Sequence, residues 1–307
     1  MGRYLFQRLI ATIVVLLGIS LIVFFVIRIT GNPVEAMLAG TEPTKQAIAA
    51  LTHAMGLDKP LPEQYWIFLS NLLHGNFGRS LYSGQSVFNL VRTRFVATAM
   101  LAVAGLLIGI VISVPLGVLA ALHKGSATDV GVRALSLLGI SFPSFWLGIM
   151  LVLIFAVKIH VLPVAGYSSW KSIILPAVTL GAGQAGIMTG LIRSNMIDVL
   201  GEQYIQTARA KGLRGVAVVY LHGLRNAMLP VVTYLGLSLG TLLGGVVIIE
   251  QVFAWPGIGQ LMITAIDQRD YPVVQGGAVI LALFIVLSNL AVDLCYTLID
   301  PRIKISS

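Results

Sequence analysis

Six long stretches without a charged side chain constrain the fold of this sequence more than any other feature. They are Leu9–Ile27, Phe95–His123, Ala134–Val157, Ser172–Ile192, Asn226–Ile249 and Tyr271–Val292. Each is long enough for an α-helix to cross a bilayer core, which takes roughly 17–25 residues. Transmembrane strands need only about 10 residues and alternate in polarity, so strands are not expected here. The sequence therefore predicts an all-α integral membrane protein with six transmembrane helices.

The composition supports a membrane protein and argues against a soluble one. Charged residues make up 10% of the chain and hydrophobic residues 57%, whereas soluble proteins carry about 25% charged residues. The net charge of +8 comes from basic residues between apolar runs, which favours membrane lipid over nucleic acid as the partner. Cys295 is the only cysteine, so an intrachain disulfide, a thiol metal site and a redox pair are excluded.

Basic residues in the short loops predict the orientation, because loops rich in Lys and Arg tend to stay in the cytoplasm. One side would hold Arg3, Arg8, Lys124, Arg133, Arg193, Arg209, Lys211, Arg214, Arg225, Arg302 and Lys304. Outside the long 28–94 segment, the other side would hold only Lys158, Lys171 and Arg269. Both termini are therefore expected in the cytoplasm. The expected parts are a first helix with an external segment (1–94), a five-helix core (95–300) containing a cytoplasmic loop (198–230), and a cytoplasmic tail (301–307).

Local signals predict further detail within these parts. The external segment should contain helices near Thr44–Met55 and Pro62–Leu73, with turns at residues 31–33 and 75–78. Prolines in three of the apolar stretches lack a backbone N–H and should bend their helices: Pro115, Pro143 and Pro176. Glycines at four-residue spacing should let helices approach closely: Gly186 and Gly190, and Gly236, Gly240 and Gly244.

No motif for catalysis, cofactor binding or metal binding is present. The sequence lacks the GxxxxGK[ST] loop that cradles nucleotide phosphates, and its five histidines have no ligand spacing. Asp293 is the only carboxylate expected inside the spans, near the cytoplasmic end of the last one. It is more readily explained by bonding to nearby backbone or snorkelling than by proton relay. A transport protein with no energy source of its own would need a partner to supply one.

The cytoplasmic loop offers a docking segment for such a partner. Residues 202–211 form good helix sequence, with acidic Glu202 at the start and basic residues at the end to match the helix dipole. Gly212 should end the helix, because glycine readily adopts the positive φ of that position. Tyr204, Ala208 and Lys211 are expected on one face. From these residues alone, a helix lying on the membrane surface is favoured over a docking helix.

At this loop the sequence resembles a known family. Glu202–Leu213 followed by His222–Pro230 is similar to the EAA loop of ABC importer permeases, in the form found in the dipeptide, oligopeptide and nickel family. Gln206, Thr207 and Ala208 stand where the general motif has Glu-Ala-Ala, and Gly212 matches its glycine. Other matching segments are Met1–Arg8, Gly31–Pro33, His53–Asp58, Gly75–Gly78, Glu250–Gly259, Arg269–Pro272 and Asp293–Arg302.

The resemblance implies a type I ABC importer permease fold, a bacterial inner-membrane location and a set of partners. These are a second, similar permease subunit, two cytoplasmic ATP-binding subunits and an extracytoplasmic solute-binding protein, with ATP bound by the partners and no cofactor in this chain. The implied ATPase-coupling residues are Glu202, Tyr204, Thr207, Ala208, Arg209, Lys211, Gly212 and Leu213. A contact with the binding protein is conceivable at Trp255, Pro256, Gly257, Arg269 and Asp270, although an anchor that re-inserts the last span explains these residues equally well.

The solute is not specified by these motifs. A peptide-sized solute (a dipeptide, an oligopeptide or glutathione) is the first expectation, with a nickel complex as the alternative in the same family. An ion-coupled secondary carrier would need more buried charge and no EAA loop. A sensory or scaffold membrane protein using the same loop to bind a signalling ATPase also remains open.

Overall fold

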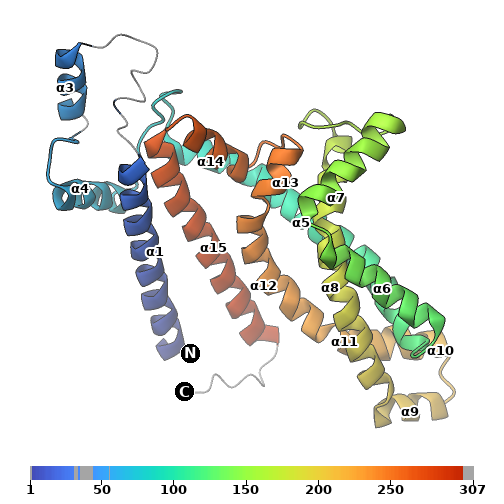
Figure 1. The fold of residues 1–307 in the computed structure, drawn as a ribbon. Helices are drawn as coiled ribbons and strands as arrows, with labels where there is room; N and C mark the ends of the chain where they lie inside the picture. The colour runs from blue at the N-terminus through green and yellow to red at the C-terminus, as the bar shows by residue number, and fades with distance from the viewer. Residues whose placement is uncertain (1, 31–33, 35–43, 55, 300–307) are drawn as a thin grey trace. The chain divides into compact units, whose positions relative to one another are not determined.

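The computed structural model describes residues 2–30, 34, 44–54 and 56–299. Within these ranges the chain is helical apart from turns and one isolated β-bridge between Arg79 and Ser86. Contacts group the chain into two compact units, which are described separately (Figure 1). Unit 1 comprises residues 1–97 and 257–307, and unit 2 comprises residues 98–256.

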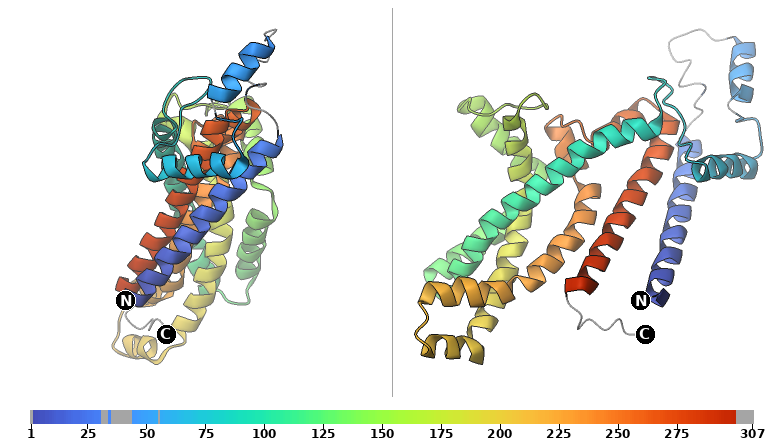
Figure 2. Two further views of the ribbon diagram at one scale, coloured as in Figure 1. Left: turned by 90° about the vertical axis from the view of Figure 1, so that its left-hand side faces the viewer. Right: turned by 180° about the vertical axis from the view of Figure 1, so that it is seen from behind.

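Unit 1 is built around two long helices that pack side by side. Its elements are α1 (Gly2–Thr30), α3 (Lys45–Ala54), α4 (Leu61–Leu73), the first turns of α5 (Val87–Leu122), α14 (Ile258–Asp267) and α15 (Tyr271–Ile299). α1 packs along α15, and the start of α1 lies at the same end as the end of α15 (Figures 1 and 2). Val87, Ile258 and Val273 join α5, α14 and α15 in one buried cluster.

The two helices predicted between residues 44 and 73 form as the sequence predicts, and α4 lies across the end of α1 (Figure 1). The rings of Phe24 and Tyr65 meet edge to face with centroids 5.2 Å apart. Glycines with positive φ turn the chain after α4, at Gly75 (φ 75°) and Gly78 (φ 88°). These predictions are confirmed, whereas the turn expected at residues 31–33 lies outside the described residues.

Unit 2 consists of helices arranged around α8. Its elements are α5 from Thr98 onward, α6 (Ala127–Ser141), α7 (Ser144–Leu151), the π-helix η1 (Val152–Lys158), the 3-10 helix η2 (Trp170–Ile173), α8 (Ile174–Leu200), α9 (Gln203–Ala210), α10 (Gly215–Ala217), the π-helix η3 (Val218–Leu224), α11 (Arg225–Ala227), α12 (Leu229–Gly245) and α13 (Val247–Val252). α8 contacts α6, α7, α12 and α13.

Glycines bring α8 within backbone distance of its neighbours. A Cβ atom on Gly186 would lie 2.6 Å from the Ser136 carbonyl oxygen of α6, and one on Gly181 would lie 2.7 Å from the Gly105 carbonyl oxygen of α5. Neither helix could approach this closely if a side chain were present. The close approach predicted at Gly186 is confirmed, but Gly190 faces open space, and the contact at Gly181 was not predicted.

Four described helices are long and apolar enough to cross a membrane, and the number rises to six if each of two bent pairs is one span. The six predicted spans are therefore matched only when α6 with α7–η1, bent by 101°, and α10–α11 with α12, bent by 45°, are each counted once. Pro143 lies at the first break, as predicted. Pro176 instead lies in the first turn of α8, where a helix N–H has no intrahelical acceptor to lose. The bend at Pro176 stays a prediction.

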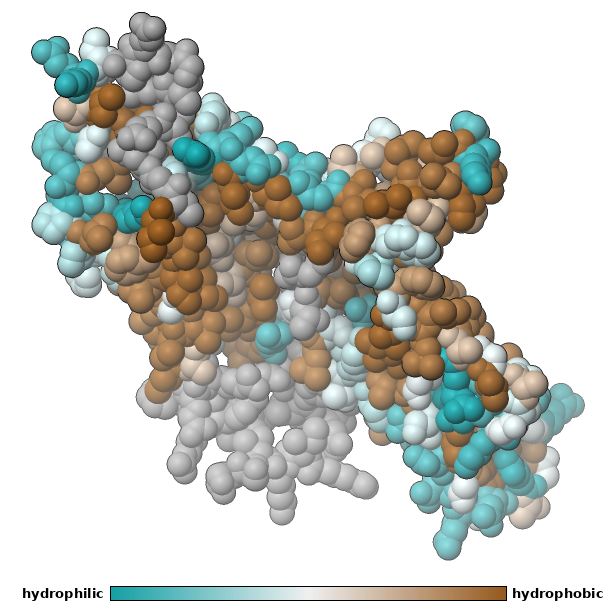
Figure 3. Space-filling view, in the orientation of Figure 1, coloured by the Kyte–Doolittle hydropathy of each residue, from teal (hydrophilic) through white to brown (hydrophobic). Residues whose placement is uncertain are grey.

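The surface of these helices is apolar over much of their length. α1 exposes Ile13, Val14, Ile22 and Val26, and its surface is correspondingly hydrophobic (Figure 3). Polar surface covers the end of unit 2 that carries α9 and α10 (Figure 3). The predicted division of the chain at residue 94 stays a prediction.

Candidate functional site

The candidate site is α9, a short helix that follows α8 at one end of unit 2 (Figure 1). Glu202 precedes it in an extended conformation, and the Glu202 carbonyl accepts a hydrogen bond from the Ile205 N–H at 3.1 Å. The Glu202 side chain makes no capping hydrogen bond. Its remaining local contribution is a negative charge near the free N–H groups of the first turn.

Gly212 ends α9 in the manner that the sequence predicts. Its φ is +78°, which favours glycine, and a Cβ atom placed there would meet nothing within 4 Å. The Gly212 N–H donates to the Arg209 carbonyl at 2.9 Å, and the Leu213 N–H donates to the Ala208 carbonyl at 3.3 Å. This pair of bonds is a Schellman motif, which satisfies two carbonyls at the helix end.

The inner face of α9 packs on η3 of the same chain. Ile205 is fully buried and Ala208 is 8% exposed, and both contact Val218. Val199 and Leu200, at the end of α8, close the cluster. Ala208, which was predicted to share a face with Tyr204 and Lys211, is buried against its own chain while Tyr204 and Lys211 are exposed, because the neighbouring η3 covers the Ile205–Ala208 side.

The outer face of α9 is left open to a partner. Thr207, Arg209, Lys211 and Leu213 are exposed. Tyr204 is 42% exposed, and its hydroxyl accepts a hydrogen bond from the Asn226 side-chain amide at 2.8 Å. The predicted coupling residues thus expose a threonine hydroxyl, two cations and an apolar leucine, while Tyr204 is hydrogen-bonded to Asn226 of α11.

Apolar packing connects α9 to the long helices of unit 2. Val218 contacts α9, and the adjacent Val219 belongs to a second buried cluster with Met188, Ile192 and Met196 of α8. Ala227 and Val231 bring α11 and α12 into the same cluster. Movement of α9 would therefore be transmitted through η3 to α8 and α12, because close-packed interiors deform little.

Sequence reasoning missed a buried ion pair between α6 and α8. The Arg193 guanidinium donates two hydrogen bonds to the carboxylate of Asp129, from Nε at 2.5 Å and from Nη2 at 2.7 Å. Asp129 is 1% exposed, and it also accepts a hydrogen bond from the Gly125 N–H at 2.9 Å. The local signal was Ser126 three residues before Asp129, since Ser126 caps α6, but nothing local pointed to Arg193.

Buried carboxylates are more numerous than the sequence suggested. Besides Asp129, the side chains of Glu250 and Asp270 are almost fully buried, and Glu250 accepts a hydrogen bond from the Thr98 hydroxyl at 2.6 Å. All three lie outside the charge-free spans predicted from the sequence, so the expectation that Asp293 is the only carboxylate inside those spans stays a prediction. Asp293 lies in α15, and its side chain is outside the described part of the chain.

The residues considered for a binding-protein contact divide between the two units. In unit 2, Trp255 is 1% exposed and meets the Tyr167 ring edge to face at 4.8 Å, with partly buried Pro256 beside it. In unit 1, Gly257 precedes α14 and is buried, Arg269 is exposed with φ 55°, and Asp270 is buried.

Asp270 holds another loop of unit 1 in place. Its carboxylate accepts hydrogen bonds from the Ser80 hydroxyl at 2.6 Å and from the Leu81 N–H at 3.2 Å. Asp270 therefore shapes the segment that follows α4, whereas the neighbouring Arg269 side chain is exposed.

Comparison with known sequences identifies the class of protein that this helical scaffold belongs to. Residues 113–305 match the family described as the inner membrane component of binding-protein-dependent transport systems, and residues 1–102 match the N-terminal membrane component of such systems. The chain belongs to this family. It is a multi-pass inner-membrane permease of an ABC importer and is not itself an ATPase.

Two relatives and two solved structures illustrate the similarity. Over 305 residues and 99% of both chains, the sequence is 41% identical to the glutathione transport system permease protein GsiC of Salmonella choleraesuis (strain SC-B67). It is 40% identical, with the same coverage, to the protein of that name in Escherichia coli (strain K12).

Among structures, an inward-facing form of the MetNI methionine ABC transporter has a TM-score of 0.57 at 20% identity, over 69% of this chain and 97% of that one. An amino acid ABC transporter crystallised with histidines has a TM-score of 0.51 at 14% identity, over 70% of this chain and 95% of that one. At these identities the two structures support the fold.

Proposed function

We propose that this chain forms half of the pathway of an ATP-driven importer for a peptide-sized solute, with glutathione as the first candidate. The observation that carries the proposal is the 41% identity to a glutathione transport system permease over 99% of both chains. Such full-length similarity includes the helices that would line the pathway as well as the coupling loop. A dipeptide, an oligopeptide or a nickel complex is the alternative solute to be tested beside glutathione.

In the proposed assembly, this chain works with three other kinds of component. A second, similar permease completes the pathway, two ATP-binding subunits dock on the cytoplasmic side, and an extracytoplasmic binding protein delivers the solute. The excess of basic residues in the 198–230 loop and at the two termini supports a cytoplasmic location for α9. In this orientation, the α3–α4 segment of unit 1 lies outside.

Coupling would occur at the outer face of α9. Thr207, Arg209, Lys211 and Leu213 would contact an ATP-binding subunit, while Ala208 holds α9 on η3. When ATP binding brings the two ATP-binding subunits together, α9 would move with them and carry η3 and α8. The pathway would then alternate between outward-facing and inward-facing states.

The contact with the binding protein is assigned to the exposed members of the 255–270 group. Arg269 would meet the binding protein directly, because its side chain is exposed. Trp255 and Asp270 would support the surrounding loops, since both are buried within their own units. Pro256 and Gly257 would fix the chain direction between these loops.

Reconstitution of the complete importer tests the proposal. Proteoliposomes would contain this chain, the second permease and both ATP-binding subunits, with the binding protein and labelled glutathione added on one side. We expect accumulation that requires ATP and the binding protein, and none when this chain is reconstituted alone. A labelled dipeptide and a labelled nickel complex serve as matched solutes. Uptake of either in place of glutathione would overturn the solute assignment, and ion-driven uptake by this chain alone would overturn the importer mechanism.

A further inference from the structure

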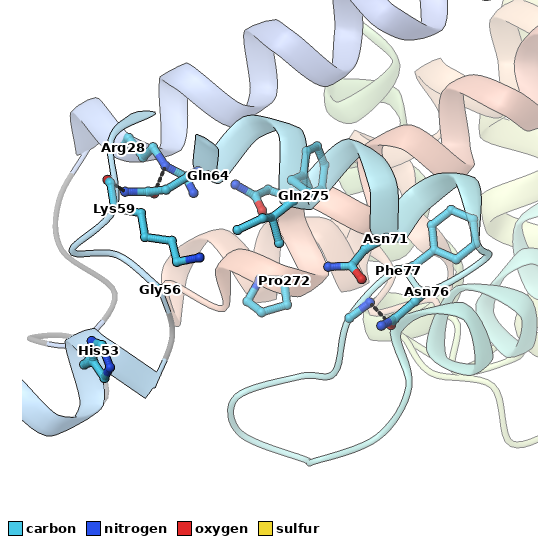
Figure 4. Close-up of a pocket in the computed structure, with 13 residues that line it drawn as sticks. Arg28, His53, Gly56, Lys59, Gln64, Asn71, Asn76, Phe77, Pro272 and Gln275 are labelled. Carbon is cyan, nitrogen blue, oxygen red and sulfur yellow. Dashed lines mark hydrogen bonds between the residues drawn. The ribbon is translucent and has the colours of Figure 1, made fainter. Parts of the chain in front are cut away.

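A pocket of about 500 Å³ opens in unit 1, where the end of α1, the α3–α4 loop, α4, the turn after α4 and the start of α15 meet (Figure 4). α4 contributes one face to it, with Gln64, Phe68 and Asn71 at helical spacing. Pro272 and Gln275 of α15 lie opposite (Figure 4). We call this site the basic pocket. Neither the family match nor the coupling site assigns it a role.

A buried glutamine fixes the cation at the top of the basic pocket. The Arg28 Nε donates to the Gln64 side-chain oxygen at 2.9 Å, and the guanidinium lies 3.4 Å from the centre of the Phe24 ring. The Gln64 amide donates in turn to the carbonyls of Leu57 at 3.1 Å and Lys59 at 2.7 Å. Gln64 is 9% exposed, so the guanidinium is held in one orientation beside the loop that carries Lys59.

The other polar groups of the basic pocket complement an anion. The Lys59 ammonium extends toward the centre (Figure 4) and bonds to Glu63 at 2.9 Å in an exposed ion pair, which is a weak interaction in water. The side-chain amides of Asn71 and Gln275 have no hydrogen-bond partner among the described residues. No acidic side chain is found among the described residues that line the pocket. An anion could therefore take Lys59 from Glu63 and bind between two cations.

His53 lies at the edge of the basic pocket, away from Arg28 (Figure 4). His53 belongs to the last turn of α3, and its Nδ1 is 2.7 Å from the carboxylate of Asp58, which lies between α3 and α4. This pair is exposed on both sides and contributes little charge to the pocket. Arg28 and Lys59 are therefore the side chains that make the charge of the pocket positive.

The position of the basic pocket relative to the membrane indicates where its ligand comes from. Arg28 lies in the last turn of the span Ile10–Ile29, and Gln275 lies near the start of the span Tyr271–Leu290. The ends of spans lie at the level of lipid headgroups. α4 lies at this level and exposes two large apolar side chains, Trp66 (67% exposed) and Leu73 (79% exposed). Such exposed apolar residues are expected for a helix lying in the membrane interface.

We propose that the basic pocket binds the phosphate headgroup of an anionic phospholipid such as phosphatidylglycerol. Arg28 and Lys59 bind the phosphate oxygens, and the amides of Asn71 and Gln275 bind the glycerol hydroxyls. The acyl chains leave over the exposed apolar residues of α1 and α4. A lipid is favoured over an acidic protein segment because the pocket lies at headgroup depth and adjoins exposed apolar surface. The proposal does not depend on which solute is imported.

Lipid binding to the intact importer complex provides the test. The complex is stripped of lipid in detergent and titrated with phosphatidylglycerol, with phosphatidylcholine and with inorganic phosphate, and bound lipid is counted by native mass spectrometry. Phosphatidylcholine serves as the matched lipid, because its choline would place a cation against Lys59. We expect saturable binding of phosphatidylglycerol and a higher unfolding temperature in its presence, with little effect of the other two.

Two variants and one control connect the binding to the basic pocket. Lys59→Gln should weaken phosphatidylglycerol binding about fivefold, the usual contribution of one basic side chain near an anionic membrane surface. Arg28→Lys should also weaken it, because lysine keeps the charge but loses the planar fork. Lys45→Gln removes an equivalent exposed charge from α3, outside the pocket, and should behave like the unaltered complex. Lys59 is on an exposed loop, so its variant remains informative even if the Arg28 variant folds poorly.

Three results would overturn the proposal. One is a Lys59→Gln complex in which phosphatidylglycerol binding and stimulation by the binding protein are both the same as in the unaltered complex. Another is equal stabilisation by inorganic phosphate, which would make the ligand a free anion. The third is normal lipid binding in Lys59→Gln together with loss of stimulation by the binding protein, which would make the pocket a receptor for an acidic protein side chain. Each leaves the proposed import function to be judged separately by solute uptake.

Discussion

Replacement of Gly212 by valine is the sharpest test of the coupling site, because the structure separates backbone strain from steric clash. The φ of Gly212 is +78°, and an added Cβ would meet nothing within 4 Å. The whole effect of Gly212→Val therefore comes from the backbone, where a β-branched residue at positive φ costs about 1–3 kcal/mol. If that strain is relieved by opening the Schellman motif, the ratio of molecules with an intact α9 end to molecules with an open one falls by about 5- to 150-fold.

The damage should stay local. α9 is held by a cluster of only three buried residues, so its end can open without disturbing the long helices of unit 2. We expect Gly212→Val to insert into the membrane at normal abundance, to lose co-purification of the ATP-binding subunits and to lose uptake. Gly212→Asn should retain most function, because asparagine tolerates positive φ.

Gly215→Val is the matched control for this series. Gly215 lies three residues away in the same loop, also has open space at its Cβ position, and is not among the residues with positive φ. It should therefore behave like the unaltered chain. Normal ATPase retention and uptake in Gly212→Val would refute the reasoning, and so would equal losses in Gly212→Val and Gly215→Val.

Three further changes test other parts of the structure. Ala208→Glu should detach α9 from η3 even without ATP-binding subunits, because it buries an unpaired charge at a cost of several kcal/mol. Limited proteolysis should then cleave the loop faster, and unchanged cleavage would mean that Ala208 is not packed inward. Asp129→Asn should lower the unfolding temperature, and Asp129→Asn with Arg193→Gln should recover part of the loss, since no buried charge is left unpaired; equal losses in the single and double variants would argue against the pair. With the native cysteine replaced, Ser83→Cys should react with an impermeant thiol reagent in intact cells and Ala210→Cys only after permeabilisation, and the reverse pattern would invert the proposed orientation.

The features that sequence predicted well depend on local chemistry. The positive φ of Gly212 was predicted because basic residues and then a glycine follow the helical sequence, and the structure confirms this φ. The α3 and α4 helices and the turn at Gly75–Gly78 follow from local propensity and glycine placement in the same way. Each of these signals lies within about ten residues of the feature that it predicts.

The features that sequence did not predict depend on contacts between distant or irregular segments. Asp129 and Arg193 are 64 residues apart, and no residue next to either one in the sequence indicates that the two side chains pair. The inward face of α9 depends on the position of η3, which is a π-helix. Because a π-helix has a wider turn than an α-helix, the usual α-helical spacing of apolar residues does not predict it from the sequence. Helical periodicity shows that Ile205 and Ala208 share a side, but it cannot show which side a neighbouring segment covers.

The way α9 is attached determines what kind of motion it can transmit. Its outer face is free, and its inner face is joined to η3 by apolar contacts that pass on to α8 through Val219 and Met196. At the same end of unit 2, the Asp129–Arg193 pair joins the start of α6 to α8. Because close-packed elements shift as bodies rather than bend smoothly, a force on α9 should move α8 and α6 together. Loss of the ion pair should then weaken the coupling of α6 to α8, which still meet at Gly186, while leaving ATPase docking intact, so less solute would be imported per ATP hydrolysed.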